Sequence, residues 1–106
     1  MSRLIGERER ALLPALYACE NAPDPAAEVK LFMPGTRWTW YLLEFDGDDT
    51  LFGYVKSGLD ERFDELGYIS LSELEALVGP FGLRVERDVH WEPTRLSVLQ
   101  ATTAIV

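Results

Sequence analysis

Four ionisable side chains recur at every second position near the end of the chain, and their types could support chemistry. Glu86, Asp88, His90 and Glu92 would share one face of a strand, spaced about 6.7 Å apart. Imidazole and carboxylate groups bind metal ions and carry protons in acid–base catalysis. A small hydrolase-like or metal-dependent enzyme using Glu86, Asp88 and His90 is therefore one hypothesis. His90 is the single histidine and no metal-ligand spacing surrounds it, so we expect a solvated strand face, with no catalytic residue, metal or cofactor.

Two further features are weaker candidates for chemistry. Asp46-Gly47-Asp48-Asp49 resembles the opening of a calcium loop, but it lacks the twelve-residue spacing and the closing glutamate. We expect a hairpin turn at this position. Cys19 is the single cysteine and cannot form an internal disulfide, so we expect a packed thiol and not a nucleophile.

Length and composition indicate one soluble domain. The 106 residues are enough for one core, and we expect a single domain over residues 1–106, with 1–4 and 100–106 as disordered tails. Hydrophobic residues make up 47% and charged residues 26%, which is typical of globular proteins. No apolar run approaches the roughly 20 residues of a membrane helix, and the first ten residues lack a signal-peptide core. We therefore expect a cytoplasmic protein that does not enter a membrane.

The negative charge is concentrated in the second half of the chain. Residues 44–92 hold 13 Asp or Glu against 4 Lys or Arg, within a net charge of −8 for the whole chain. Phosphates require cations, so this distribution argues against direct binding of nucleic acid. It permits a protein partner with a basic surface, or it serves solubility alone.

The elements that must position these residues are organised around one stretch, Trp38 to Phe45. Its β-branched and aromatic residues favour a strand. Alternation assigns Trp38, Trp40, Leu42 and Glu44 to one face, and Thr39, Tyr41, Leu43 and Phe45 to the other. Both faces are largely apolar, which predicts a strand covered on both sides, or covered on one side and used for binding on the other.

The remaining pattern predicts an α+β fold, with an antiparallel sheet of four to five strands and two main helices packed on it. We expect a helix from about Glu7 to Leu13 and another from Ser72, whose apolar residues through Val78 face inward. Predicted strands are Val29–Met33, Trp38–Phe45, Leu51–Lys56, Leu66–Ile69 and Leu83–Glu92. In the last strand, Val85, Val89 and Trp91 would face the core, and Leu96 with Leu99 would form a final helical turn.

A family resemblance rests on motifs that follow one another from about Leu4 to Leu99. They are Leu13-Pro14, Leu16-Tyr17, Val29-Lys30-Leu31-Phe32, Trp38-Thr39-Trp40-Tyr41, Glu44-Phe45-Asp46, Leu51-Phe52-Gly53, Glu65-Leu66-Gly67-Tyr68, Glu73-Leu74, Gly79-Pro80-Phe81-Gly82-Leu83, Glu86-Arg87-Asp88, Trp91 and Pro93. This combination resembles the domain-of-unknown-function 2958 family. The resemblance implies a small, single-domain bacterial protein of the kind common on plasmids, conjugative elements and prophages, often near anti-restriction genes. It supplies no catalytic residues to carry over.

These observations leave three functional hypotheses. The first is a non-enzymatic accessory protein of a mobile genetic element, acting through protein–protein binding. In its sharper form the protein is an anti-restriction or anti-CRISPR inhibitor whose acidic face mimics nucleic acid. The second is the small enzyme described above. The third is a regulatory or toxin-neutralising partner that uses an exposed aromatic strand face. The interaction candidates are Asp46, Asp48, Asp49, Asp60, Glu61, Glu86, Asp88 and Trp38, and the oligomeric state stays open.

Overall fold

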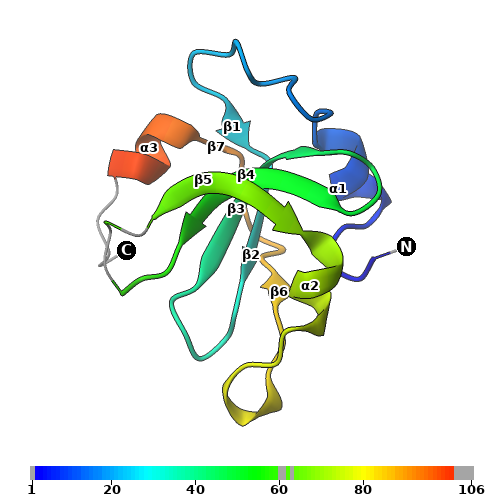
Figure 1. The fold of residues 1–106 in the computed structure, drawn as a ribbon, viewed down its shortest axis with the longest axis vertical. Helices are drawn as coiled ribbons and strands as arrows, with labels where there is room; N and C mark the ends of the chain where they lie inside the picture. Colours follow the sequence, from blue (N-terminus) through cyan, green and yellow to red (C-terminus); the bar gives the residue numbers. More distant parts are fainter. Residues whose placement is uncertain (1, 60–61, 63, 102–106) are drawn as a thin grey trace.

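The fold is an α+β arrangement built on an antiparallel sheet, as the sequence predicted. The computed structural model describes residues 2–59, 62 and 64–101 (Figure 1). Within them, five strands pair in the order β5-β4-β3-β2-β6, and β1 pairs with β7 in a separate two-stranded sheet. The strands are β1 (Ala26–Ala27), β2 (Val29–Phe32), β3 (Thr39–Phe45), β4 (Thr50–Lys56), β5 (Glu65–Ser70), β6 (Glu86–Arg87) and β7 (Thr94–Arg95). The helices are α1 (Glu7–Leu12), α2 (Leu71–Ala76) and α3 (Leu96–Ala101), with a 3-10 turn at Pro80–Gly82.

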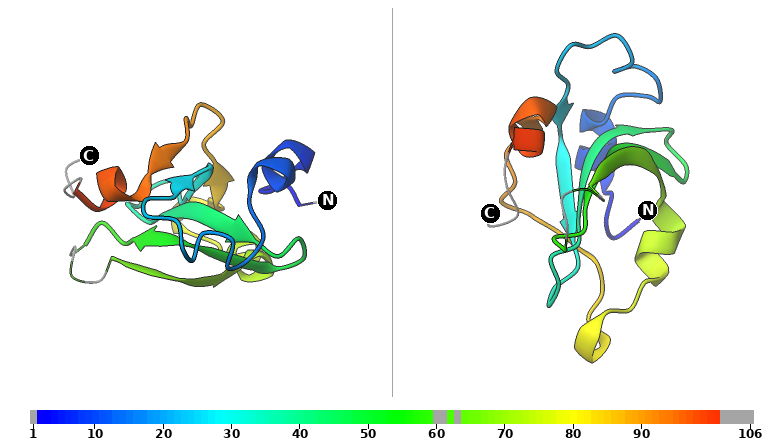
Figure 2. Two further views of the ribbon diagram at one scale, coloured as in Figure 1. Left: turned by 90° about the horizontal axis from the view of Figure 1, so that it is seen from above. Right: turned by 60° about the vertical axis from the view of Figure 1, so that its left-hand side comes forward.

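Both faces of the central sheet are covered, so β3 lies in the interior. Figure 2 shows α3 and the small sheet on one face, and α1 and α2 on the other. The first face is packed by Ala27, Leu43, Tyr54 and Leu99. The second holds the larger cluster of Leu4, Ile5, Leu13, Val29, Leu31, Met33, Trp40, Leu42, Phe45, Leu51, Leu71, Leu74 and Val85. The prediction that the Trp38–Phe45 stretch contains a strand covered on both sides is therefore confirmed.

A β-bulge in β3 corrects the predicted assignment of faces. Leu42 pairs with Gly53, but Glu44 pairs with Phe52, so Leu43 is an extra residue in the ladder. Beyond the bulge the alternation is inverted: Phe45 joins the cluster of Leu42, and Glu44 lies on the same face as Leu43. Simple alternation placed these two residues on the wrong faces because it cannot register an inserted residue.

The predicted strand from Leu83 to Glu92 is mostly wrong, since only β6 remains of it. The Asp88 carboxylate accepts the backbone N–H of His90 at 3.0 Å, and the Trp91 N–H donates to the Asp88 carbonyl at 3.2 Å. These bonds form a turn that ends the strand. Val85 is buried as predicted, whereas Val89 is 71% exposed. Trp91 packs against Tyr41 on the α3 face of the sheet, at 5.4 Å between ring centroids.

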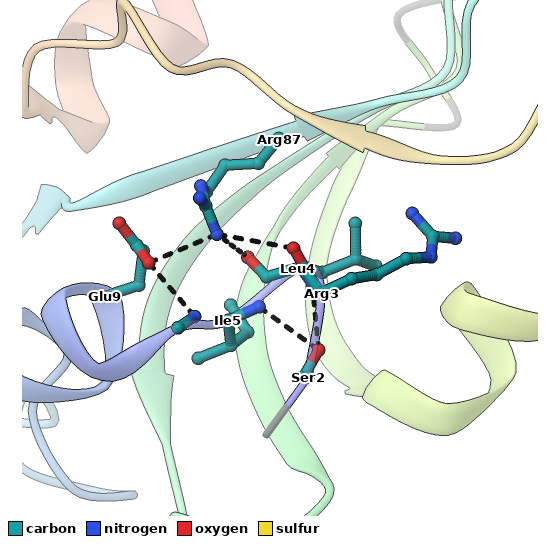
Figure 3. Close-up of polar contacts among 7 residues, drawn as sticks. Ser2, Arg3, Leu4, Ile5, Glu9 and Arg87 are labelled. Atoms are coloured by element: carbon teal, nitrogen blue, oxygen red, sulfur yellow. Dashed lines mark hydrogen bonds and ion pairs between the residues drawn. The ribbon is translucent and has the colours of Figure 1, made fainter.

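Arg87, which interrupts the apolar positions of that predicted strand, holds the N-terminal segment (Figure 3). Its guanidinium donates to the Leu4 carbonyl at 2.9 Å and lies 3.2 Å from the Glu9 carboxylate. The Glu9 carboxylate in turn accepts the Gly6 N–H at 3.0 Å, which begins α1. Ser2 accepts the backbone N–H groups of Leu4 and Ile5. The expected tail therefore includes residues that pack: Leu4 is 1% exposed.

Helix α2 is shorter than its sequence pattern predicts. Leu71 and Leu74 are buried as expected, but Leu77 and Val78 are exposed. The helix ends at Ala76, and Leu77 already has an extended backbone. Val78 then forms an isolated bridge with Arg84, which closes a protruding turn around the 3-10 segment. The segment near residue 80 extends away from the sheet in Figure 1.

Candidate functional site

The acidic turn between β3 and β4 is held by its own carboxylates. One oxygen of Asp46 accepts the backbone N–H groups of Asp48, Asp49 and Thr50 at 2.8, 3.0 and 3.1 Å. These bonds lower the pKa of Asp46, the bond from Asp48 most, because they stabilise the ionised form. The predicted hairpin turn is confirmed, and Asp46 shapes it.

Asp49 connects the same turn to the start of α2. Its two carboxylate oxygens accept the Ser70 hydroxyl at 2.8 Å and the Ser72 N–H at 2.7 Å. Ser70 also caps the helix by accepting the Glu73 N–H. The bond from Ser70, and then that from Ser72, lower the pKa of Asp49. Of the three turn aspartates, only Asp48 has a side chain that makes no hydrogen bond or ion pair with the described part of the chain.

We predict that Asp49→Ala lowers the melting temperature of the protein, whereas Asp48→Ala leaves it nearly unchanged. Asp49→Ala removes two bonds at the N-terminus of α2, where a capping interaction stabilises the helix. Because the pKa of Asp49 is lowered on folding, its contribution is complete above its ordinary pKa and is lost as the pH falls through the lowered value. Thermal melts of both variants at pH 7 and pH 3 test this: the gap between them should narrow at pH 3. An equal melting temperature at pH 7 would contradict it.

The acidic residues around β6 do not form the predicted row. Asp88 lies 3.5 Å from the Lys30 ammonium, which also lies 5.5 Å from the centre of the Trp91 ring. Glu86 is exposed on the edge strand, and His90 is exposed in the turn that follows. No group of three potential metal ligands occurs among the residues that the structure describes. The geometry of the described residues around β6 therefore does not support the enzyme hypothesis, because Glu86, Asp88 and His90 do not converge on a common site.

Trp38 borders a shallow apolar groove next to the protruding turn. It precedes β3, is 41% exposed, and stacks on Trp40 with 6.1 Å between ring centroids. The groove is also lined by Met33, Leu77 and Pro80. Phe81, at the tip of the turn, is 99% exposed and has a left-handed backbone, φ 60°. The predicted interaction residue Trp38 is thus exposed at the edge of the α2 face, where it borders a groove and does not form part of a whole exposed strand face.

A pocket that sequence reasoning missed lies on the opposite face of the sheet, between β5 and the segment preceding β1. Its volume is about 410 Å³, and its walls include Tyr17, Phe52 and Tyr68. The bulge in β3 directs Glu44 to this side, where its side chain is 4% exposed. The two Glu44 oxygens accept the backbone N–H groups of Tyr17 at 2.9 Å and Cys19 at 2.7 Å. A buried carboxylate therefore fastens residues 17–19 to the sheet and borders the pocket.

The ionisation of the pocket side chains reflects this carboxylate. Burial, followed by the charge of Glu44, raises the pKa of the Cys19 thiol. The nucleophilic thiolate is thereby disfavoured. A hydrogen bond with Tyr17 raises the pKa of Tyr68, and the carboxylates of Glu44 and Glu20 add to the shift. The pocket is accordingly lined by two carboxylates, Glu20 and Glu44, and by aromatic rings.

One sequence signal could have indicated this site. Glu44 is the sole charged residue in the eight-residue stretch Trp38–Phe45. In a strand that is covered on both faces, a charged side chain must be hydrogen-bonded or paired, because burying it without a partner is costly. Its place on the pocket face depends on the bulge, which the pattern does not reveal. Of the other predicted interaction residues, Asp60 and Glu61 lie outside the described residues. Asp46, Asp48 and Asp49 are brought together in the turn between β3 and β4, while Glu86 and Asp88 lie at β6 and Trp38 precedes β3.

Comparison with protein families gives a match over almost the whole chain. The family model described as "Protein of unknown function (DUF2958)" matches residues 4–105. Neither the curated proteins nor the solved structures give a significant match. None of the helices in the described ranges is long and apolar enough to cross a membrane.

Proposed function

The chain belongs to this family of unknown function, DUF2958, and we propose that it acts by binding a protein partner that has a basic surface. In the sharper form of the proposal, the protein serves a mobile genetic element as a counter-defence inhibitor in the cytoplasm. It would occupy the nucleic-acid groove of a restriction or CRISPR-type complex.

The observation that carries the proposal is the composition of the half of the sheet that ends at the edge strand β5. The segments 38–55 and 64–83, which form β3, most of β4, β5, α2 and their connections, contain no Lys or Arg. Exposed carboxylates stand on three of these elements, at Asp48, Glu65 and Glu73. Arg10, on the neighbouring α1, forms no ion pair with these carboxylates in the described structure. Its guanidinium lies over the Phe45 ring, 5.5 Å from the ring centre. Carboxylates at this edge can take the positions of phosphates in a basic groove, where the same Lys and Arg side chains would pair with them.

The test is competition with DNA on purified restriction and CRISPR-type complexes. We expect the protein to displace a DNA duplex from at least one such complex, and its apparent affinity to fall as salt rises. The reason is screening: the Debye length shortens from about 8 Å at 0.15 M salt to about 3 Å at 1 M. DNA binding by the complex alone must be measured at each salt concentration, since it weakens too.

Matched charge variants locate the binding face. A triple variant, Asp48→Asn, Glu65→Gln and Glu73→Gln, should weaken inhibition roughly tenfold, because three exposed ion pairs of a few tenths to 1 kcal/mol each would be lost. The control, Glu7→Gln, Glu86→Gln and Glu92→Gln, removes the same charge from exposed positions elsewhere and should retain inhibition. If both triple variants changed inhibition equally, or if inhibition did not depend on the salt concentration, the proposal would be wrong. The acidic residues would then serve solubility.

A second candidate function, a regulatory or toxin-neutralising partner, is favoured by the apolar groove beside Trp38. A partner bound there would insert apolar side chains between Trp38, Leu77 and Pro80. Such binding would survive high salt and be lost in Trp38→Ser. The salt series above therefore separates the two candidates.

A further inference from the structure

The side chains around Glu44 have the chemistry of a site for a cation. Its lining includes two carboxylates, Glu44 and Glu20, and no Lys or Arg. Both Glu44 oxygens accept one backbone N–H each. A carboxylate has about four acceptor sites, so Glu44 can accept further hydrogen bonds from a group that enters the pocket. A charge that is 4% exposed with no ionic partner in the described structure is costly, and a bound cation would offset that cost.

The walls of the pocket favour the same kind of ligand. Phe52 and Tyr68 lie with 5.1 Å between ring centroids, and Tyr17 stands across from Tyr68 within hydrogen-bonding reach. Aromatic faces attract cations through the ring quadrupole, and the attraction is larger when the cation is desolvated. Aromatic rings beside a buried carboxylate therefore select an organic cation over an anion or a purely apolar group.

We infer that this pocket receives an arginine side chain of the basic protein partner, an inference that rests on the proposed function. Arginine fits better than lysine because its planar guanidinium can stack on Tyr17 or Tyr68 while its N–H groups donate to Glu44. The pocket opens beside β5, at the edge whose exposed carboxylates are expected to face the partner. The arginine would then be the buried anchor of an interface whose rim is electrostatic.

The probe for the inference is capped arginine, Nα-acetyl-arginine amide, titrated into the isotopically labelled protein and followed by amide NMR shifts. We expect saturable shifts centred on Tyr17, Cys19 and Glu44. Capped citrulline has nearly the same shape without the charge, and it should bind at least about tenfold more weakly, as expected for losing charge-assisted hydrogen bonds. Free arginine should bind no more tightly than the capped form, because the partner's residue lies within a chain.

Two variants test the residues themselves. Tyr68→Ala removes an exposed ring of the pocket and should weaken capped arginine about fivefold, the scale of one cation–π contact. The control, Phe81→Ala, removes another exposed ring, outside the pocket in the protruding turn, and should leave the affinity unchanged. Glu44→Gln should abolish binding, provided its spectrum shows a folded protein; Tyr68→Ala decides the question if it does not.

Three results would overturn the inference. They are equal affinity for capped citrulline, an absence of localised shifts up to about 50 mM capped arginine, or free arginine binding more than about tenfold tighter than the capped form. The last would identify a site for the free amino acid. These outcomes are separable from failure of the proposed function. Capped arginine can bind while no defence complex is inhibited, and inhibition can depend on salt while the pocket stays empty.

Discussion

Trp40→Ala is expected to destabilise the folded protein by about 3–5 kcal/mol, the usual range for deleting a large aromatic side chain from a core. Trp40 is 7% exposed and belongs to the cluster that joins β2, β3 and α2. It faces Leu31 on β2 and Val55 on β4, so its removal would leave a cavity between three strands. Urea denaturation followed by circular dichroism measures the change, because the fluorescence signal itself would be altered.

Trp38→Ala is the matched control for this prediction. Trp38 stacks on Trp40, but 41% of it is exposed and it precedes the strand. We expect a loss of about 1 kcal/mol or less, mainly the stacking contact. If the two variants were equally stable, Trp40 would not be a core residue. The groove beside Trp38 would then gain weight as a binding surface.

The sequence was sufficient for the fold class because its local signals agree with one another. The predicted Asp46–Asp49 turn follows the end of β3, and the helix predicted from Ser72 corresponds to α2. Between them, the apolar positions follow the strand or helix period. When the turn and cap residues agree with the apolar period, a helix or strand can be predicted without knowledge of its tertiary contacts.

The prediction fails where a side chain far along the chain decides the local structure. The alternation of Leu83–Glu92 favoured a long strand, but β2 offers pairing only to Glu86 and Arg87. Asp88 then pairs with Lys30 and turns the chain, and Arg87 turns from the predicted core row to the N-terminal segment. Such long-range polar contacts leave no periodic trace in the sequence.

The candidate pocket was missed for a related reason, since it depends on the bulge in β3. The pattern placed Glu44 beside Trp40, where a charge would disrupt the core. The inserted Leu43 instead directs Glu44 toward the segment at Tyr17–Cys19. A shift of one residue in the register therefore decides where the Glu44 carboxylate lies. Without the bulge it would enter the core and destabilise the strand, and with the bulge it borders the pocket.

Gly53→Ala is expected to destabilise the protein by about 3 kcal/mol, the upper end of the usual range for overpacking, because a contact with backbone atoms cannot be relieved by a rotamer change. Gly53 pairs with Leu42 at the start of the bulge, and a Cβ built on it would overlap the Tyr41 carbonyl oxygen. Both strands are interior, so neither can move away without breaking a ladder. Residual folded protein should also lose the bulge geometry, and with it the binding of capped arginine at Glu44.

Gly67→Ala is a control one strand away. Gly67 is the direct cross-strand partner of Gly53, yet a Cβ built on it meets nothing within 4 Å. Its backbone does not require a left-handed conformation, so alanine should be neutral or stabilise by up to about 1 kcal/mol by restricting the unfolded chain. Urea titration of both variants compares them directly. Equal urea midpoints for the two variants would mean that β4 accommodates a side chain at Gly53. The close approach of the β3 and β4 backbones would then not explain the bulge.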